Sequence, residues 1–253
     1  MTKVFVHGNP ETSAIWGPLM TELNARGVDD IVALSPPGFG APAPEGFAAT
    51  PAAYVDWLAG ELSSMEGPLD LLGHDWGAGH VLGLAAAHPD LIRSYAVDIS
   101  GILHEDYVWH DMAQVWRTPE AGEQAIEAST AMTNEEKTGL FVALGMPDDI
   151  AAEVGSHLNA EMGDCILKLY RGADPEVLAD LSARLLAADD RPSLILNAEE
   201  DAYVGAELSP EIAKRTGSQI VSLPGQGHWW MVQDPAPAAE ALANFWGLID
   251  TTA

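Results

Sequence analysis

Cysteine, basic residues and long apolar runs are all scarce in this chain of 253 residues. The lone Cys165 excludes an internal disulfide and a cysteine-rich metal site, and its apolar neighbours favour a core position. Only 11 Lys and Arg stand against 38 Asp and Glu, and the formal net charge of −27 would repel nucleic-acid phosphates and anionic lipid. The sequence has no signal peptide and no apolar run of the roughly 20 residues that cross a bilayer. We therefore expect a cytoplasmic protein without nucleic-acid or membrane partners.

Short apolar segments alternate with helical patterns along most of the chain. Six segments have the length and composition of strands: 3–6, 31–34, 69–72, 94–99, 193–197 and 219–223. Strands that alternate with helices predict an α/β fold with a mostly parallel sheet and right-handed crossovers.

This alternation stops between residue 101 and about residue 170. Only helical patterns occur there, and they predict helices at 120–132, 135–144 and 148–161. We interpret 101–170 as a helical cap that is inserted into a core formed by 1–100 and 171–253.

A glycine-flanked carboxylate follows the third predicted strand, in Gly73-His74-Asp75-Trp76-Gly77. The spacing is that of a nucleophile elbow, a sharp strand-to-helix turn that presents one side chain to a cavity. An alternative is that Asp75 only caps the next helix, but capping does not require glycine on both sides. No serine occupies the central position, which disfavours a serine esterase and makes Asp75 the candidate nucleophile.

Two further strand ends carry polar residues that suit the same chemistry. Asp201 follows the fifth strand and His228 precedes the last helix, so the order after Asp75 is nucleophile, acid, base. The turn after the first strand aims the Asn9 backbone N–H at a developing oxyanion, with the Trp76 N–H as its partner. The alternatives are that His228 has only a structural role and that the segment after the first strand is an ordinary turn.

Together these segments resemble the epoxide hydrolase and haloalkane dehalogenase branch of the α/β-hydrolases. The motif Gly-His-Asp-Trp-Gly-Ala is typical of an aspartate nucleophile. The resemblance implies an alkyl-enzyme ester on Asp75, hydrolysed by a water that His228 activates while Asp201 orients the imidazole. It implies no cofactor and no metal. Members of this branch usually begin with two more strands, so we expect 31–34 to be a sheet edge unless the N-terminus or a second copy in a homodimer covers it.

Two features are similar to epoxide hydrolases in particular. One is the segment His7-Gly8-Asn9-Pro10-Glu11, and the other is the Tyr170-Arg171 step, which implies that Tyr170 protonates the epoxide oxygen. The resemblance therefore favours the opening of a small or medium apolar epoxide to a diol, with water as the second substrate. The pocket is expected to be lined by aromatic and methionine side chains of the cap, namely Tyr107, Trp109, Met112 and Trp116. Tyr107 is either a second acid or a packing residue.

Other features keep two alternatives open. Epoxide hydrolases usually have an aromatic residue where Asn9 stands, and Asn9 with Trp76 is the pair that holds halide in haloalkane dehalogenases. Asp98 ends its strand at the alternative acid position that some of those enzymes use. The alternative function is therefore release of halide from an apolar haloalkane. A hypothesis from another class is a small-molecule receptor on a hydrolase scaffold, which turnover measurements would separate from an enzyme.

Overall fold

A computed structural model describes residues 1–188 and 190–252, and its centre is one parallel sheet of six strands. The strands span Lys3–Val6 (β1), Ile31–Leu34 (β2), Leu69–Gly73 (β3), Ile92–Val97 (β4), Ser193–Ala198 (β5) and Gln219–Leu223 (β6). Their order is β2-β1-β3-β4-β5-β6, and each neighbouring pair is parallel. The predicted fold is confirmed, and β2 lies at one edge of the sheet as expected.

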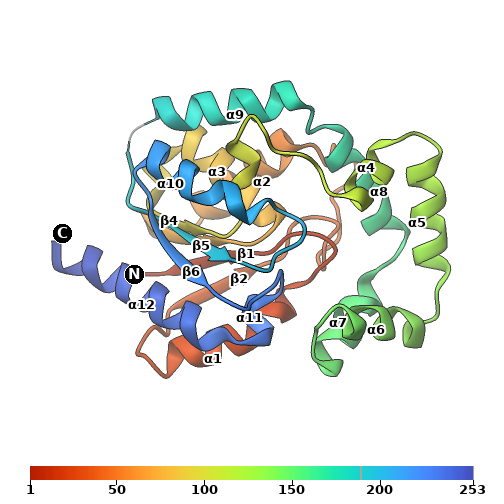
Figure 1. The fold of residues 1–253 in the computed structure, drawn as a ribbon, viewed down its shortest axis with the longest axis horizontal. Coiled ribbons are helices and arrows are strands. Elements are labelled where there is room, and N and C mark those ends of the chain that lie inside the picture. The colour runs from red at the N-terminus through yellow and green to blue at the C-terminus, as the bar shows by residue number, and fades with distance from the viewer. Residues whose placement is uncertain (189, 253) are drawn as a thin grey trace.

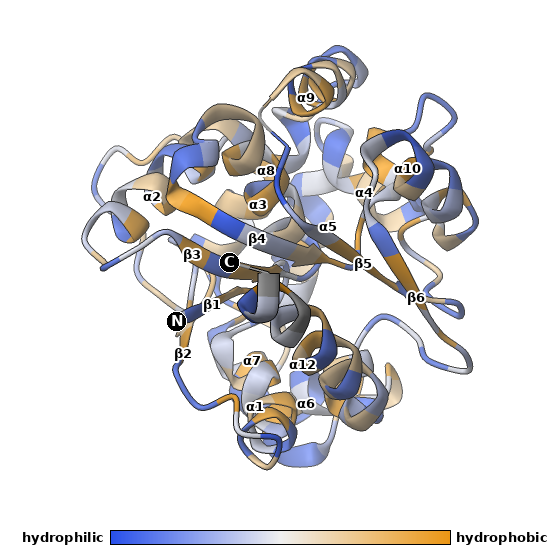
Figure 2. Cartoon of the chain, turned by 90° about the vertical axis from the view of Figure 1, so that its left-hand side faces the viewer, coloured by the Kyte–Doolittle hydropathy of each residue, from blue (hydrophilic) through white to orange (hydrophobic). Residues whose placement is uncertain are grey.

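Helices cover both faces of this sheet (Figures 1 and 2). One face carries Pro51–Ser63 (α2), Trp76–Ala87 (α3), Pro175–Ala187 (α9) and Ser209–Thr216 (α10). The opposite face carries Gly17–Asn24 (α1), Trp230–Gln233 (α11) and Pro235–Thr252 (α12). The central strands β1 and β3 are buried along their whole length, which explains why they are mostly apolar instead of alternating. Their two charged side chains form a buried ion pair, with Lys3 Nζ 3.2 Å from Asp70 Oδ2.

The strand-free stretch forms an inserted helical region at one side of the core (Figure 1). It contains Asp111–Arg117 (α4), Ala121–Ala131 (α5), Asn134–Ala143 (α6), Asp148–His157 (α7) and Ala160–Arg171 (α8). The helix predicted over 148–161 was wrong at its end. Helix α7 ends at His157, and a new helix, α8, begins two residues after Leu158. Asn159 caps α8, because its side chain accepts the Met162 N–H at 3.0 Å.

Within the described residues, no helix is both long and apolar enough to cross a membrane.

Candidate active site

The turn from β3 into α3 holds Asp75 in a strained conformation. Asp75 has φ 50° and ψ −125°, a region that residues other than glycine rarely enter. The neighbouring glycines are needed for space: a Cβ at Gly77 would lie 2.0 Å from the Val6 carbonyl oxygen, and one at Gly8 would lie 2.2 Å from Asp75 Oδ1. The strain therefore falls on Asp75 itself, while the glycines let the first strand and its loop approach the carboxylate.

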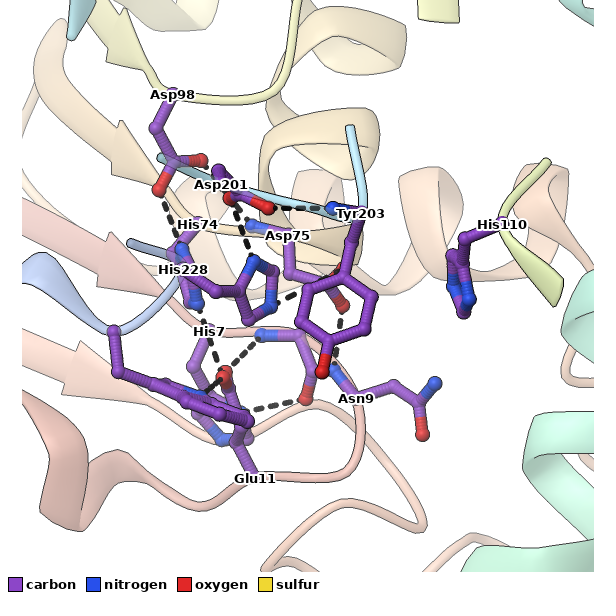
Figure 3. A network of polar contacts seen from close by, with 12 residues as sticks. His7, Asn9, Glu11, His74, Asp75, Asp98, His110, Asp201, Tyr203 and His228 are labelled. Carbon is purple, nitrogen blue, oxygen red and sulfur yellow. Dashed lines mark hydrogen bonds and ion pairs between the residues drawn. The ribbon is translucent and has the colours of Figure 1, made fainter. Parts of the chain in front are cut away.

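Asp75, His228 and Asp201 lie next to one another at the carboxyl ends of the strands (Figure 3). His228 Nδ1 lies 2.8 Å from Asp201 Oδ2, and Asp201 Oδ1 accepts the Tyr203 N–H at 2.8 Å. An ionised carboxylate can only accept, so Nδ1 carries the proton and Nε2 remains basic. His228 Nε2 lies 3.9 Å from Asp75 Oδ2. The imidazole is thus oriented by one carboxylate toward the other, in the order that the sequence predicts.

A backbone donor holds the other oxygen of Asp75. The Asn9 N–H donates to Asp75 Oδ1 at 2.8 Å. The Trp76 N–H belongs to the first turn of α3, whose N–H groups have no acceptor within the helix. Both amides that the sequence assigns to an oxyanion hole therefore adjoin the carboxylate.

The protonation of this group follows from its surroundings. Burial raises the pKa of Asp75 to about 6, although the charge of His228 acts in the opposite direction. Burial also acts to lower the pKa of His228, but the charge and hydrogen bond of Asp201 outweigh it, and the net pKa is raised. Asp75 is therefore ionised at neutral pH and protonated in mild acid.

A cavity of about 20 Å³ lies above Asp75, room for about one water molecule. Tyr170, in the last turn of α8, is only 2% exposed and lines this cavity. Its hydroxyl oxygen accepts Asn9 Nδ2–H at 3.2 Å. Burial and the charge of Asp75 raise the pKa of Tyr170 well above its ordinary value, and hydrogen bonds from the Trp76 and Asn9 side chains act against them. The phenol thus stays protonated, with its hydrogen available to a bound molecule.

Of the four side chains predicted to line the pocket, only two do so in the structure. Tyr107 and Trp109 line the cavity. Trp116 does not line it but packs against the Tyr170 ring, with centroids 5.0 Å apart. Met112 is 46% exposed and lies on the outside of the insertion, because α4 turns its Ala113 side inward.

A second buried cluster of charged groups lies directly behind Asp75. His74 sits between two carboxylates, with Nδ1 2.5 Å from Asp98 Oδ2 and Nε2 3.0 Å from Glu11 Oε1. The Trp229 and Trp230 indoles donate to Glu11 and Asp98 at 2.6 and 2.7 Å. Asp98, predicted as an alternative acid, therefore contacts His74, whereas Asp201 contacts His228.

His74 carries a positive charge in this cluster. Burial acts to lower its pKa, but the negative charges of Asp98 and Glu11 outweigh burial and raise the pKa well above the ordinary value. Ligand atoms of Glu11, His74 and His228 lie within 4.8 Å of one another. A doubly protonated imidazole has no lone pair for a metal, so His74 cannot serve as a ligand in this state and only Glu11 and His228 remain of the three. These three side chains therefore suit an ionic network rather than a metal centre.

Sequence reasoning missed two residues of the site. Tyr203 packs its ring against His228 at 5.0 Å between centroids, and His110 packs against Tyr203 at 5.1 Å. Both line the cavity. Tyr203 follows Asp201 by two residues, but an aromatic residue there has no chemical pattern that marks it. His110 lies in the irregular segment before α4, where the sequence has no periodicity to orient it.

The architecture and the elbow agree with a comparison to known families. The profile of the alpha/beta hydrolase family matches residues 4–241, and the chain belongs to this family.

Individual relatives are more distant. The chain is 24% identical over 260 residues to the 2-(acetamidomethylene)succinate hydrolase of Mesorhizobium japonicum, covering 96% of this chain and 86% of that protein. Among solved structures, it is similar to the haloalkane dehalogenase DbeA of Bradyrhizobium elkani USDA94, with a TM-score of 0.77, 21% identity, and coverage of 100% and 91%. A lipase-like structure from Acinetobacter baumannii AYE matches with a TM-score of 0.72 and 15% identity, over 100% of this chain and 85% of that one. Similarity at these identities shows the fold.

Proposed function

We propose that this alpha/beta hydrolase opens a small epoxide to a diol through a covalent ester on Asp75. The observation that carries the proposal is the Tyr170 hydroxyl, which lines the cavity above Asp75 while Asn9 Nδ2–H donates to its oxygen at 3.2 Å. Donors on a phenol oxygen polarise its O–H bond and stabilise the developing phenolate. Tyr170 is therefore suited to protonate the oxygen that leaves carbon.

In the first step, Asp75 Oδ2 attacks an epoxide carbon and the carbon–oxygen bond of the ring breaks. The ring oxygen takes the Tyr170 proton and becomes a hydroxyl, so no free alkoxide forms. The product is an ester between the Asp75 carboxyl and the hydroxyalkyl group. The aromatic side chains that line the cavity, Tyr107 and Trp109 among them, suit an apolar substrate.

In the second step, His228 Nε2 takes a proton from water, and the hydroxide formed attacks the Asp75 carboxyl carbon. The Asn9 N–H, already 2.8 Å from Asp75 Oδ1, stabilises the charge of the tetrahedral intermediate. Its collapse breaks the bond between the carboxyl carbon and Oδ2, the ester oxygen that carries the alkyl group. The departing diol oxygen takes the proton of the hydroxyl that came from water, so the diol leaves and the carboxylate is restored. The proton on His228 returns through solvent to the Tyr170 phenolate, so the net reaction adds one water to one epoxide.

A haloalkane is the second candidate substrate. The similarity to haloalkane dehalogenase structures favours it, as does the pair of side-chain N–H donors from Asn9 and Trp76. The Tyr170 hydroxyl oxygen already occupies the point on which these donors converge, where a departing halide would otherwise bind. This occupancy makes us place the epoxide first.

Tyr170→Phe distinguishes the two substrates. We expect the variant to lose about 100-fold or more in kcat/KM for an epoxide such as 1,2-epoxybutane, because ring opening then lacks its acid. A halide leaves without a proton, so the rate with 1-bromobutane should stay the same or rise. Tyr95→Phe, which alters a buried tyrosine outside the cavity, is the matched control. Unchanged epoxide turnover in Tyr170→Phe would refute the role of the phenol.

The raised pKa of Asp75 predicts an acid limb in the pH profile. Only the carboxylate is nucleophilic, so kcat/KM should fall about tenfold per pH unit below pH 6, where Asp75 takes up a proton. The profile is measured from pH 4.5 to 8 on protein whose fold is checked by circular dichroism at each pH. A flat profile down to pH 4.5 would contradict an Asp75 pKa near 6.

A further inference from the structure

His110 lines the cavity among apolar and aromatic groups. Its ring packs edge to face against Tyr203 at 5.1 Å, Trp116 at 6.1 Å and Tyr170 at 6.3 Å between centroids. It comes from the segment that enters the helical insertion, and Figure 3 shows its ring opposite the Asp75 and His228 side of the site. It therefore faces the part of a bound molecule that lies away from the nucleophile.

One ring nitrogen of His110 already has a fixed role. The side chain caps α4, and Nδ1 accepts the Ala113 N–H at 3.3 Å. An accepting Nδ1 is unprotonated, so in the neutral ring the hydrogen is on Nε2. Burial, with the charge of His228, lowers the pKa of His110 to about 4, which keeps the ring neutral at physiological pH.

The other nitrogen is left for a ligand. No described residue accepts a hydrogen bond from His110 Nε2, and the ring is only half-buried, so water is the partner of this nitrogen before a ligand binds. A ligand that displaces this water without bringing an acceptor leaves the donor unpaired, which costs free energy, whereas a ligand with an acceptor oxygen avoids that cost. A neutral imidazole donates a hydrogen bond but is a very weak acid. His110 is therefore suited to bind a substrate oxygen, whereas Tyr170 donates the proton.

We propose that His110 is a specificity-determining residue whose Nε2–H binds an acceptor oxygen on the substrate, separate from the epoxide ring. The inference rests on the proposed function and narrows its substrate class from purely apolar epoxides to those with an ether, carbonyl or hydroxyl oxygen near the ring. A site with a committed donor discriminates against the analogue that lacks the acceptor.

The test compares two substrates of the same shape, glycidyl methyl ether and 1,2-epoxypentane, in which an oxygen replaces a methylene. The quantity is the ratio of their kcat/KM values, because any intrinsic difference in reactivity is shared by all variants. His110→Phe keeps a flat ring without the donor, and His110→Ser keeps a helix-capping oxygen without the imidazole. We expect both variants to lower the ether-to-alkyl ratio about tenfold relative to wild type. His157→Phe, at an exposed histidine of the insertion, should leave the ratio unchanged.

A second measurement does not depend on turnover. Long-range 1H–15N spectra of histidine-labelled protein, assigned with His110→Ser, should show His110 as the Nε2–H tautomer. Adding 3-methoxypropane-1,2-diol should shift the Nε2 resonance, and pentane-1,2-diol should not. A ratio unchanged in both variants, an Nδ1–H tautomer or equal shifts with both diols would overturn the role of His110. If wild type turns over neither epoxide, the proposed function fails, and the spectra still decide whether His110 binds the oxygen.

Discussion

Asp75→Asn is expected to lower kcat by about 10⁴-fold or more, the scale seen when a residue of a catalytic triad is removed. The amide has nearly the same shape as the carboxylate and can still accept the Asn9 N–H, but it is a far weaker nucleophile. Turnover of an epoxide is measured in the variant and in Asp29→Asn, an exposed aspartate that should behave as wild type.

The same substitution should make the protein more stable, which separates lost chemistry from misfolding. The pKa of Asp75 is about 6 in the folded protein, against 3.8 for an ordinary aspartate, so folding favours the neutral form. That contribution is present below about pH 4 and lost as the pH rises through 6, and an asparagine keeps it at every pH. We expect a Tm above that of wild type at pH 7.5, with the difference shrinking toward pH 4. An active variant, or an inactive one that melts lower at pH 7.5, would contradict this account.

His228→Ala is expected to stop the reaction after its first step. Asp75 can still form the ester, but no described side chain replaces Nε2, which lies 3.9 Å from Asp75 Oδ2, as the base for water. Steady-state turnover should fall by about 10⁴-fold or more. If the substrate is a haloalkane, one equivalent of halide per protein should appear before turnover stops.

His157→Ala removes an exposed histidine of the insertion and is the control. Circular dichroism and Tm establish that His228→Ala is folded. Steady turnover of this variant within tenfold of wild type would exclude His228 as the base.

The core of the site could be predicted from sequence because its parts are local to strand ends. The spacing around Asp75 requires a tight turn, and parallel strands bring the loops after β3, β5 and β6 to one edge. Because both loops lie at that edge, the sequence predicts that His228 and Asp201 are in contact although they are remote in the chain. The strands were predicted within two residues at their ends because buried apolar runs flanked by Gly and Pro are distinctive.

The partner of Asp98 could not be predicted in the same way. Several histidines and carboxylates end up at the same edge of the sheet, and spacing does not decide which pair forms. The strand order does: β4 lies beside β3, so Asp98 meets His74, whereas β5 lies beside β6, so Asp201 meets His228. The ionic cluster behind Asp75 thus depends on a topology that only the structure supplies.

The helical insertion was the least predictable part. Its helices are short, and their buried faces depend on neighbours that are remote in sequence. Met112 was expected to point inward and is exposed, while His110, two residues earlier, lines the cavity. Tyr170 was identified by its likeness to a motif and not by periodicity. Its position depends on α8, which begins at the Asn159 cap inside a stretch predicted as one longer helix.

The intact mass of His228→Ala after incubation with an epoxide tests the central claim most directly. The account predicts a gain equal to the whole epoxide, localised to the peptide that contains Asp75 and absent from the Asp75→Asn, His228→Ala double variant. A gain equal to an alkyl group after incubation with a haloalkane, with none from epoxides, would establish the second candidate substrate. An unmodified His228→Ala protein, from a chain whose wild type turns over the same substrate, would contradict covalent catalysis by Asp75.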